Sequence, residues 1–406
     1  MKRQLRPVVV GSLAILALIA LASPWISSLE PREFPTRDSV RALQPLNSSP
    51  YPTPLAAAGA NNADPISQIQ KLYQTSPGLE AIPPAAGSDQ VQVGVFMLNN
   101  YDLDMTVPMA SSTGILWLRW QEPFQKKLEA AKTTAADLLI LPNQIKTWNG
   151  QTKVIDQTPI RLADGGYYQR LRFDANFYVQ HLGLERYPFQ TVHIPLMIQL
   201  SDASADFTFD KLRLVPDRAD SGVGRFIDLN GFVMRGWNIA EFLTNFATDF
   251  GLSTARDPRA HMSMSEIIFD VVYCRSALSA IWTLFQPLAI VMATVILSPS
   301  LSSRFWDIRI AIPATAILTM VFLQQGYRAS LPQLPFLTFI DRIYVICYVI
   351  CFACFGLYVW AANALQAASG EREGLVAQQI DRVDLRFQSI SLISVLVGGL
   401  ISWMVI

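Results

Sequence analysis

One apolar stretch limits what this chain can fold into. DIRIAIPATAILTMVFLQQGYRASLP, Asp307 to Pro332, is long enough to cross a membrane as a helix. It nevertheless carries an Asp at one end, Thr315 in the middle and Gln325 near the other end. Because hydrocarbon imposes a high cost on each such group unless it faces protein or water, the rest of the fold must supply that environment.

The polar groups belong to one stripe along this helix. Its members recur every three or four residues, so on an α-helix they fall within an arc of about 80°. The stripe consists of Asp307, Ala311, Thr315, Leu318, Phe322 and Gln325. Its ends are about 27 Å apart, comparable to the hydrocarbon thickness. Such a stripe either faces the interior of a helix bundle or, where identical copies surround an axis, lines a pore.

A pore lined by this stripe has a definite chemistry. Asp307 forms a ring at the cytoplasmic mouth, followed by small and hydroxyl rings, and then by hydrophobic constrictions at Leu318 and Phe322 that gate by dewetting. The acidic ring predicts cation selectivity. Arg309 points about 200° away from Asp307 and is expected to anchor the helix at the cytoplasmic interface, while Pro313 is expected to kink it. The face expected to meet other helices carries Ile310, Ile312, Ile317 and Val321.

Four apolar segments near the C-terminus predict a multi-pass membrane protein. The chain has 406 residues and is 51% hydrophobic, which is too apolar for an ordinary soluble protein. The predicted spans are about 277–297, 308–327, 340–362 and 387–406. Single crossings place Arg304, Arg382 and the basic N-terminus on one side, which the positive-inside rule makes cytoplasmic. Residues 276–406 are therefore predicted to form a four-helix domain among the lipids of the cytoplasmic (inner) membrane, with the preceding domain extracytoplasmic.

The N-terminal region predicts export. Basic residues precede an apolar run, and Ala20-Leu21-Ala22 offers a cleavage pattern, so residues 1–26 are a signal peptide or, uncleaved, an N-terminal membrane anchor. Residues 27–63 have the composition of a Pro-rich linker. Asp64 and Pro65 then predict a short helix at the start of the domain 64–275.

Residues 64–275 predict an antiparallel β-sandwich of the immunoglobulin-like type. Short runs alternate apolar and polar residues and are separated by clusters of Gly, Pro, Asn and Asp. The runs are 91–98, 114–120, 158–162, 167–179, 191–200, 205–215, 231–242 and 265–273. One helical patch, 124–139, interrupts them. The four cysteines lie in or beside the C-terminal apolar segments, so this domain is expected to have no disulfide.

Several short features follow one another in a recognisable order. They are LWLRWQEP at 116–123, RYPFQTVHIPLMI at 186–198, Arg275 before the first apolar segment, Pro287 within it, and SLPQLPFLTFID at 330–341. With a Cys-poor β-domain and four spans, they resemble the prokaryotic pentameric ligand-gated ion channels, bacterial relatives of the Cys-loop receptors. The segment 186–198 is similar to the family's signature loop. Gln190 stands where that loop usually has Asp, and the flanking Cys pair is absent, as in bacterial members.

The resemblance implies a homopentamer that opens when a ligand binds between adjacent β-domains. Loops of these domains would press on the loop after the pore-lining helix and tilt that helix. The coupling residues implied are Tyr187, Pro188, Phe189, Arg275 and Pro332. The alternative interpretation is structural, with the two prolines fixing turns and Arg275 anchoring the chain at the interface.

The agonist is expected to be a small molecule, an ion or a proton. Candidate ligand-binding residues are Trp117, Trp148, Tyr167, Asp202 and Phe250, with Trp237 as a further aromatic. The aromatics would hold an amine by cation–π attraction, although large aromatics in a sandwich are also core residues. Asp202 would instead receive a cation such as calcium. Proton gating would use His181, His193 or His261.

Other functional classes are excluded by composition and motifs. The 32 basic and 32 acidic residues provide no polybasic surface, so no nucleic-acid partner is expected. The chain has no nucleophile–base motif, phosphate loop or metal-ligand spacing, so we expect neither enzyme activity nor a metal or other cofactor. Two alternatives to a channel remain: a non-conducting membrane receptor or sensor of the same architecture, and a cell-envelope scaffold.

Overall fold

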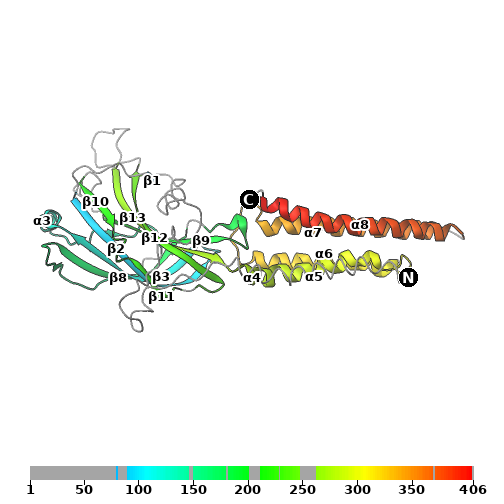
Figure 1. The fold of residues 1–406 in the computed structure, drawn as a ribbon, viewed down its shortest axis with the longest axis horizontal. Helices are drawn as coiled ribbons and strands as arrows, with labels where there is room; N and C mark the ends of the chain where they lie inside the picture. The colour runs from blue at the N-terminus through cyan, green and yellow to red at the C-terminus, as the bar shows by residue number, and fades with distance from the viewer. Residues whose placement is uncertain are drawn as a thin grey trace, which may run out of the picture. The chain divides into compact units, whose positions relative to one another are not determined.

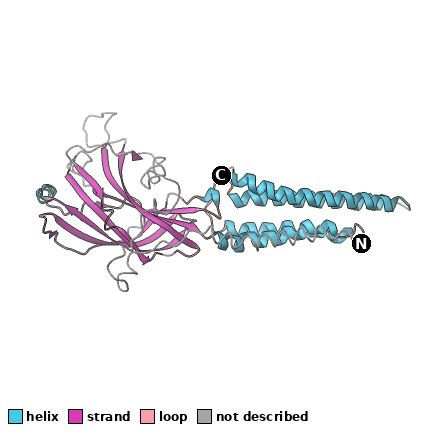
Figure 2. Ribbon diagram, in the orientation of Figure 1, coloured by secondary structure: helices cyan, strands magenta, loops and turns pink. Residues whose placement is uncertain are grey.

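The computed structural model describes residues 79–80, 89–145, 150–179, 182–200, 211–227, 229–246, 262–368 and 371–404. The predicted signal peptide or anchor, the linker and the short helix lie outside these ranges. The described residues fall into two compact units. A β-rich unit includes the described residues from Leu79 to Leu182 and from Thr191 to Cys274, and a helical unit includes Gly183–Gln190 and the described residues from Arg275 onward (Figure 2). A β-rich domain followed by four apolar helices is the predicted layout.

The larger sheet of the β-rich unit has eight strands. Its order is β10-β2-β3-β8-β5, with β11 also paired to β2, and β6 and β7 also paired to β8. The bounds are β2 Asp89–Asp104, β3 Met109–Trp120, β5 Gln144–Ile145, β6 Gln151–Val154, β7 Ile160–Arg161, β8 Tyr167–Tyr178, β10 Leu212–Pro216 and β11 Gly222–Phe226. Strands β2, β3 and β8 form its centre, as the alternating runs predicted.

The second sheet has five strands in the order β1-β12-β13-β9-β4. The bounds are β1 Leu79–Glu80, β4 Leu139–Ile140, β9 Thr191–Leu200, β12 Phe232–Phe246 and β13 Met262–Arg275. Polar bonds join the two sheets: Asn100 on β2 donates to the Tyr273 hydroxyl on β13 at 3.0 Å, and Leu214 N–H on β10 donates to Ser265 Oγ on β13 at 2.9 Å. The domain is therefore sandwich-like, with a core between its sheets.

The prediction of a wholly antiparallel domain is wrong at one edge. Strands β10 and β11 both pair with β2 in parallel. The chain reaches this edge from β9, in the other sheet, and a strand that crosses between sheets can enter in either direction. Between the two strands, Asp217 N–H donates to Val93 C=O at 2.7 Å and Ser221 Oγ accepts from Val95 N–H at 3.0 Å. The backbone of β2 thus stays hydrogen-bonded between its pairings with β10 and β11.

The predicted helical patch 124–139 is shorter in the structure. Helix α3 spans Glu122–Ala131 and ends where Lys132 adopts a left-handed conformation with φ 53°. The Asp137 carboxylate then accepts from both the backbone N–H (3.1 Å) and the hydroxyl (2.7 Å) of Thr134. Since Thr and Asp form such local bonds readily, they favour a turn at this point.

The described part of the helical unit contains four helices long and apolar enough to cross a membrane, which indicates a multi-pass membrane protein. The first, Ala277–Ser300, comprises α4 (Ala277–Ala280), the π-helix η4 (Ile281–Phe285), α5 (Gln286–Leu297) and the 3-10 turn η5 (Ser298–Ser300). The others are α6 (Trp306–Arg328), α7 (Phe339–Ala367) and α8 (Glu371–Met404). The π-turn directly precedes Pro287, whose missing N–H leaves a carbonyl without its helical partner.

The helices pack as a bundle in which α6 contacts α5 and α7, and α8 contacts α7 and α5 (Figure 1). Two helices extend beyond the predicted spans. Helix α7 continues past residue 362 to Ala367, and α8 begins at Glu371, before the predicted span 387–406. The segment 371–386 is too polar to register as part of a span, yet it contains good helix formers and continues the α8 helix.

Candidate functional site

The predicted stripe on α6 is exposed over its whole length. All six members, from Asp307 to Gln325, are exposed in the single chain. The two large apolar members are among them: 57% of the surface of Leu318 and 68% of the surface of Phe322 is exposed. A helix that packs against two others thus keeps one continuous face uncovered by its own bundle.

The opposite face of α6 is buried. Its buried residues are Arg309, Pro313, Ala316, Met320 and Tyr327, which lie about 180° from the stripe on a helical projection. Ile310, Ile312, Ile317 and Val321 lie instead on the flanks of the helix, where the three isoleucines are partly buried and Val321 is exposed. The prediction for Arg309 is wrong, since this side chain is 1% exposed and lies inside the bundle.

Pro313 does not break α6, which is continuous from Trp306 to Arg328. The hydroxyls on this helix bond to its own backbone: Thr315 Oγ1 donates to Ala311 C=O at 2.8 Å, and Thr319 Oγ1 to Thr315 C=O at 2.9 Å. The Thr315 oxygen keeps its lone pairs as acceptors on the exposed face.

A second feature, here called the aromatic junction, lies at one end of the bundle. It consists of Tyr187, Phe189, Arg275, Phe285, Tyr327, Phe339 and Trp403. The Tyr187 ring stacks on Tyr327 with centroids 6.0 Å apart, and the Arg275 guanidinium lies 5.2 Å from the Tyr187 ring. The Tyr187 carbonyl accepts from Ile340 N–H at 3.3 Å.

Phe189 contacts three further helices within the aromatic junction. Its ring lies 5.8 Å from Phe285 on the first span, 6.1 Å from Phe339 on α7 and 5.8 Å from Trp403 on α8. The segment Gly183–Gln190 belongs to the helical unit, and these ring contacts join it to the helices. The peptide bond between Tyr187 and the buried Pro188 is cis.

Asp341 holds the start of α7 beside the aromatic junction. Its Oδ1 accepts from the Tyr327 hydroxyl at 2.5 Å and from Arg328 Nη2 at 2.9 Å. Its Oδ2 accepts from Thr338 N–H at 3.1 Å and Oγ1 at 2.9 Å, which completes a capping box. One buried carboxylate thus links the end of α6 to the beginning of α7.

Pro332 lies in the loop between α6 and α7. There it lines a pocket of about 270 Å³ with Arg328, Leu331 and Asp341, among others. Of the five predicted coupling residues, the structure gathers Tyr187, Phe189 and Arg275 in the aromatic junction. Pro188 is part of the same segment, and Pro332 belongs to the loop that follows α6.

Of the five predicted ligand-binding residues, the structure describes Trp117 and Tyr167. Trp148, Asp202 and Phe250 lie outside the described residues, as do His181 and His261. The Trp117 ring crosses Gly94, where an added Cβ would lie 2.1 Å from it, and Trp117 Nε1 donates to Asp217 Oδ2 at 3.0 Å. These contacts hold Trp117 in place as part of the sheet.

Two further aromatics have structural surroundings. The Tyr167 hydroxyl donates to Glu122 Oε2 at 2.9 Å, and its ring stacks on Trp120. That hydrogen bond is the main reason that the pKa of Tyr167 is raised. Trp237 is buried against Phe269 and is therefore a core residue.

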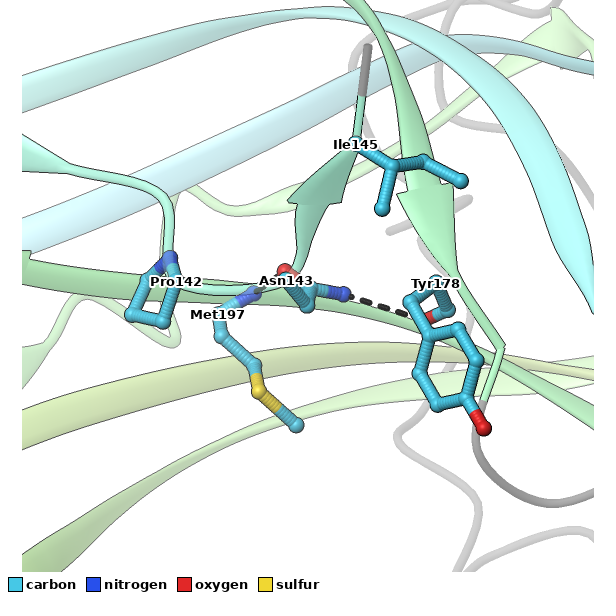
Figure 3. Close-up of a pocket in the computed structure, with 5 residues that line it drawn as sticks. All are labelled: Pro142, Asn143, Ile145, Tyr178 and Met197. Atoms are coloured by element: carbon cyan, nitrogen blue, oxygen red, sulfur yellow. Dashed lines mark hydrogen bonds between the residues drawn. The ribbon is translucent and has the colours of Figure 1, made fainter. Parts of the chain in front are cut away.

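The β-rich unit contains a pocket that no motif indicated. It has a volume of about 270 Å³ and is lined by Pro142, Asn143, Ile145, Tyr178 and Met197. Figure 3 shows Asn143 between Met197 and Tyr178. The Asn143 amide bonds to backbone, donating to Pro195 C=O at 2.8 Å and Tyr178 C=O at 3.3 Å and accepting from Met197 N–H at 3.1 Å. The walls are otherwise mainly apolar, which suits a small apolar ligand better than an amine.

The partly buried His193 pairs with a buried carboxylate. Its Nδ1 lies 2.6 Å from Asp270 Oδ2, and the Asp270 side chain is fully buried. Burial alone would lower the pKa of His193, but the charge of Asp270 and the hydrogen bond to it raise that pKa overall. The folded domain therefore holds the imidazolium form to higher pH than the unfolded chain does.

This pair predicts a pH dependence of stability. A raised pKa contributes stability that is complete below the unfolded value of about 6.5 and is lost as the pH rises through the folded value. We expect the thermal unfolding midpoint of the detergent-solubilised chain to fall as the pH rises above about 6.5, and this slope to flatten in His193→Gln. Burial also raises the pKa of Glu266, but Glu266 is present in both proteins, so the difference between their pH profiles reports on His193. Parallel profiles for the two proteins would contradict the assignment of this pH dependence to His193.

Several contact residues were not predicted as site residues. Phe285, Tyr327, Phe339 and Trp403 become neighbours only in the folded bundle, so their sequence positions gave no signal. Asp341 did have a signal in the sequence, because Thr338 and Asp341 have the spacing of a capping box directly before an apolar run. No family model matches the chain, and no curated protein is detectably similar to it.

Proposed function

We propose that this chain is the subunit of a homopentameric, ligand-gated, cation-selective channel of the cytoplasmic membrane. The observation that carries the proposal is the stripe on α6. It is exposed along the full helix and runs from a carboxylate through small and hydroxyl groups to Leu318 and Phe322. In a monomer this face would put Asp307 and Thr315 toward lipid, at a high cost. Around an axis of identical copies, the same face meets water.

The proposal includes the finer features of the β-rich unit. Its sheets are taken as an immunoglobulin-like, extracytoplasmic sandwich, with the agonist bound between neighbouring sandwiches. The segment Tyr187–Phe189 would carry movement of that domain to the helices, because its rings contact residues of all four spans. Arg275, over the Tyr187 ring, lies at the point where β13 leads into the first span. No enzymatic role is proposed.

A non-conducting receptor of the same architecture is the second candidate. The two apolar rings favour it, because Leu318 and Phe322 in succession would form a long hydrophobic barrier. Recordings from purified protein in planar bilayers separate the candidates. Discrete single-channel steps support the channel, whereas silence through screens of pH, calcium and amines supports the receptor. A particle mass in detergent that corresponds to five copies would support the homopentamer, which both candidates share.

Cysteine accessibility tests the pore directly. Thr315→Cys and Leu318→Cys are expected to react with a water-soluble thiol reagent in the assembled protein, and Ala316→Cys, on the buried face, is the matched control. The native Cys347, Cys351 and Cys354 are buried, so replacing only Cys274 by Ser gives a low background. Equal protection of all three introduced thiols, with or without activation, would reject the pore.

Neutralising the acidic ring tests selectivity. Asp307→Asn is expected to reduce K⁺ over Cl⁻ permeability by about tenfold, since the ring concentrates cations at the mouth. The measurement is the reversal potential in asymmetric KCl. Arg304→Gln, at an exposed position three residues earlier, is the control for a nearby charge change and should not reduce that ratio. An unchanged reversal potential in Asp307→Asn would remove Asp307 from the selectivity mechanism.

A further inference from the structure

A buried ion pair fastens the beginning of α6 to α8. Arg309 Nη2 lies 2.5 Å from Asp384 Oδ2, and the two side chains are 2% and 3% exposed. The Arg309 guanidinium also lies 4.3 Å from the ring of Tyr358 on α7. The Tyr358 hydroxyl in turn lies 2.5 Å from Ser298 Oγ, at the end of the first span. Through Tyr358, contacts around this pair extend to all four membrane-spanning helices.

Stability alone does not account for the pair. Arg309 Nε and Asp384 Oδ1 are both buried and have no hydrogen-bond partner among the described residues, so the guanidinium does not engage the carboxylate with two parallel bonds. Desolvation of two charges is expensive, and buried pairs with incomplete hydrogen bonding are often no more stabilising than apolar residues of similar volume. The pair is therefore better explained by the effect of its two charges on neighbouring groups.

The surroundings include the acidic end of the stripe. Arg309 follows Asp307 by two residues, a rise of only about 3 Å along the helix. Its side chain points away from the stripe, but its charge is at the same level. Protein interiors screen charges weakly, so five uncompensated guanidinium groups around a mouth would oppose the five carboxylates of Asp307. Asp384 cancels that positive charge in each subunit.

We propose that Asp384 is a specificity-determining residue of the channel, which acts through Arg309 by neutralising its charge and holding it inside the bundle. The inference rests on the proposed function and adds a residue that lies on neither the stripe nor the helix that carries it. A merely structural pair makes a different prediction. Its disruption would reduce the amount of assembled protein without changing which ions pass.

The test measures reversal potentials in asymmetric KCl for the full chain in planar bilayers. All variants also carry Leu318→Ser, here called the background, which is expected to open the pore without agonist by removing an apolar ring. Asp384→Asn is expected to lower K⁺ over Cl⁻ permeability by about threefold to tenfold. Arg309→Gln is expected to shift the ratio in the opposite direction. The double variant Arg309→Gln/Asp384→Asn is expected to return to the background value. Opposite shifts that cancel are the signature of charge compensation.

Asp381→Asn is the matched control, since Asp381 is an exposed carboxylate one turn earlier on α8, and it should leave the ratio unchanged. If Asp384→Asn fails to assemble, the shift in Arg309→Gln and its cancellation in the double variant still decide the question. If the background conducts but Arg309→Gln and Asp384→Asn leave the K⁺ over Cl⁻ permeability ratio unchanged, or shift it in the same direction, the inference is overturned and the proposed channel stands. If the background never conducts, the inference and the proposed channel are both overturned.

Discussion

Replacing Leu318 by Ser is expected to make the assembled protein conduct without agonist. Leu318 is the first of the two exposed apolar residues on the stripe, with 57% of its surface uncovered. In a pentamer five such side chains would form a ring that water leaves readily, and this dewetting closes the pore to ions. A hydroxyl in each copy holds water in the constriction. Lowering the barrier by about 1.4 kcal/mol raises conductance about tenfold, and five substitutions should reach at least that value.

The measurement is the basal current of purified protein in planar bilayers, normalised to the amount of incorporated pentamer. Leu323→Ser is the matched control, because it makes the same chemical change on the same helix about 140° from Leu318. It is expected to leave the basal current low. Equal currents for the two variants, or no current from Leu318→Ser, would show that the stripe does not surround the permeation path.

Asp341→Asn is expected to destabilise the helical unit by about 2–4 kcal/mol. The buried carboxylate accepts bonds from Tyr327, Arg328 and Thr338. An amide offers only one acceptor oxygen and turns two N–H donors toward groups that are themselves donors. The substitution also weakens the half of the capping box in which the Asp341 side chain accepts from Thr338 N–H, whereas Thr338 Oγ1 still accepts from the backbone N–H of residue 341. The unfolding midpoint in detergent should fall accordingly.

Arg328→Gln is the control for this network. Arg328 is about half exposed, with 52% of its side chain accessible, and an exposed partner contributes less than about 1 kcal/mol. The expected order of stability is therefore the unsubstituted chain, then Arg328→Gln, then Asp341→Asn by a clear margin. Similar losses in the two variants would mean that the ion pair, rather than the buried carboxylate with its neutral donors, supports this end of the bundle.

The layout and the stripe could be predicted from the sequence because both depend on local periodicity. Alternation with period 2 found the long strands such as β8 and β9, and spacing of three and four residues found the exposed face of α6. The strands that were missed have two to five residues, too few for a period, and are fixed by pairing with β2, β8, β9 or β12. The parallel edge was missed because strand direction depends on where the chain crosses between sheets.

The sites were predicted less completely, for a different reason. Contacts such as Phe189 with Trp403 join residues far apart in sequence, and only packing brings them together. Arg309 was misjudged because a basic residue near the end of a span usually anchors it at the interface. Its partner, Asp384, lay in a stretch that seemed to be a polar connection, so no acidic residue was available to pair with it. Buried ion pairs between distant helices leave no local signature.

The borders of the two sheets bear on how the copies in the proposed pentamer would meet. Within the described residues, the outermost strands are fragments: β1 and β4 have two residues each, β10 and β11 five each, and β5, β6 and β7 two to four. Very short edge strands are one of the devices by which proteins limit the pairing of a sheet edge with another chain. In the proposed pentamer, such borders would disfavour polymerisation through the sheets before the ring assembles. The proposed subunits would then recognise one another through side chains, as a closed ring of defined size requires.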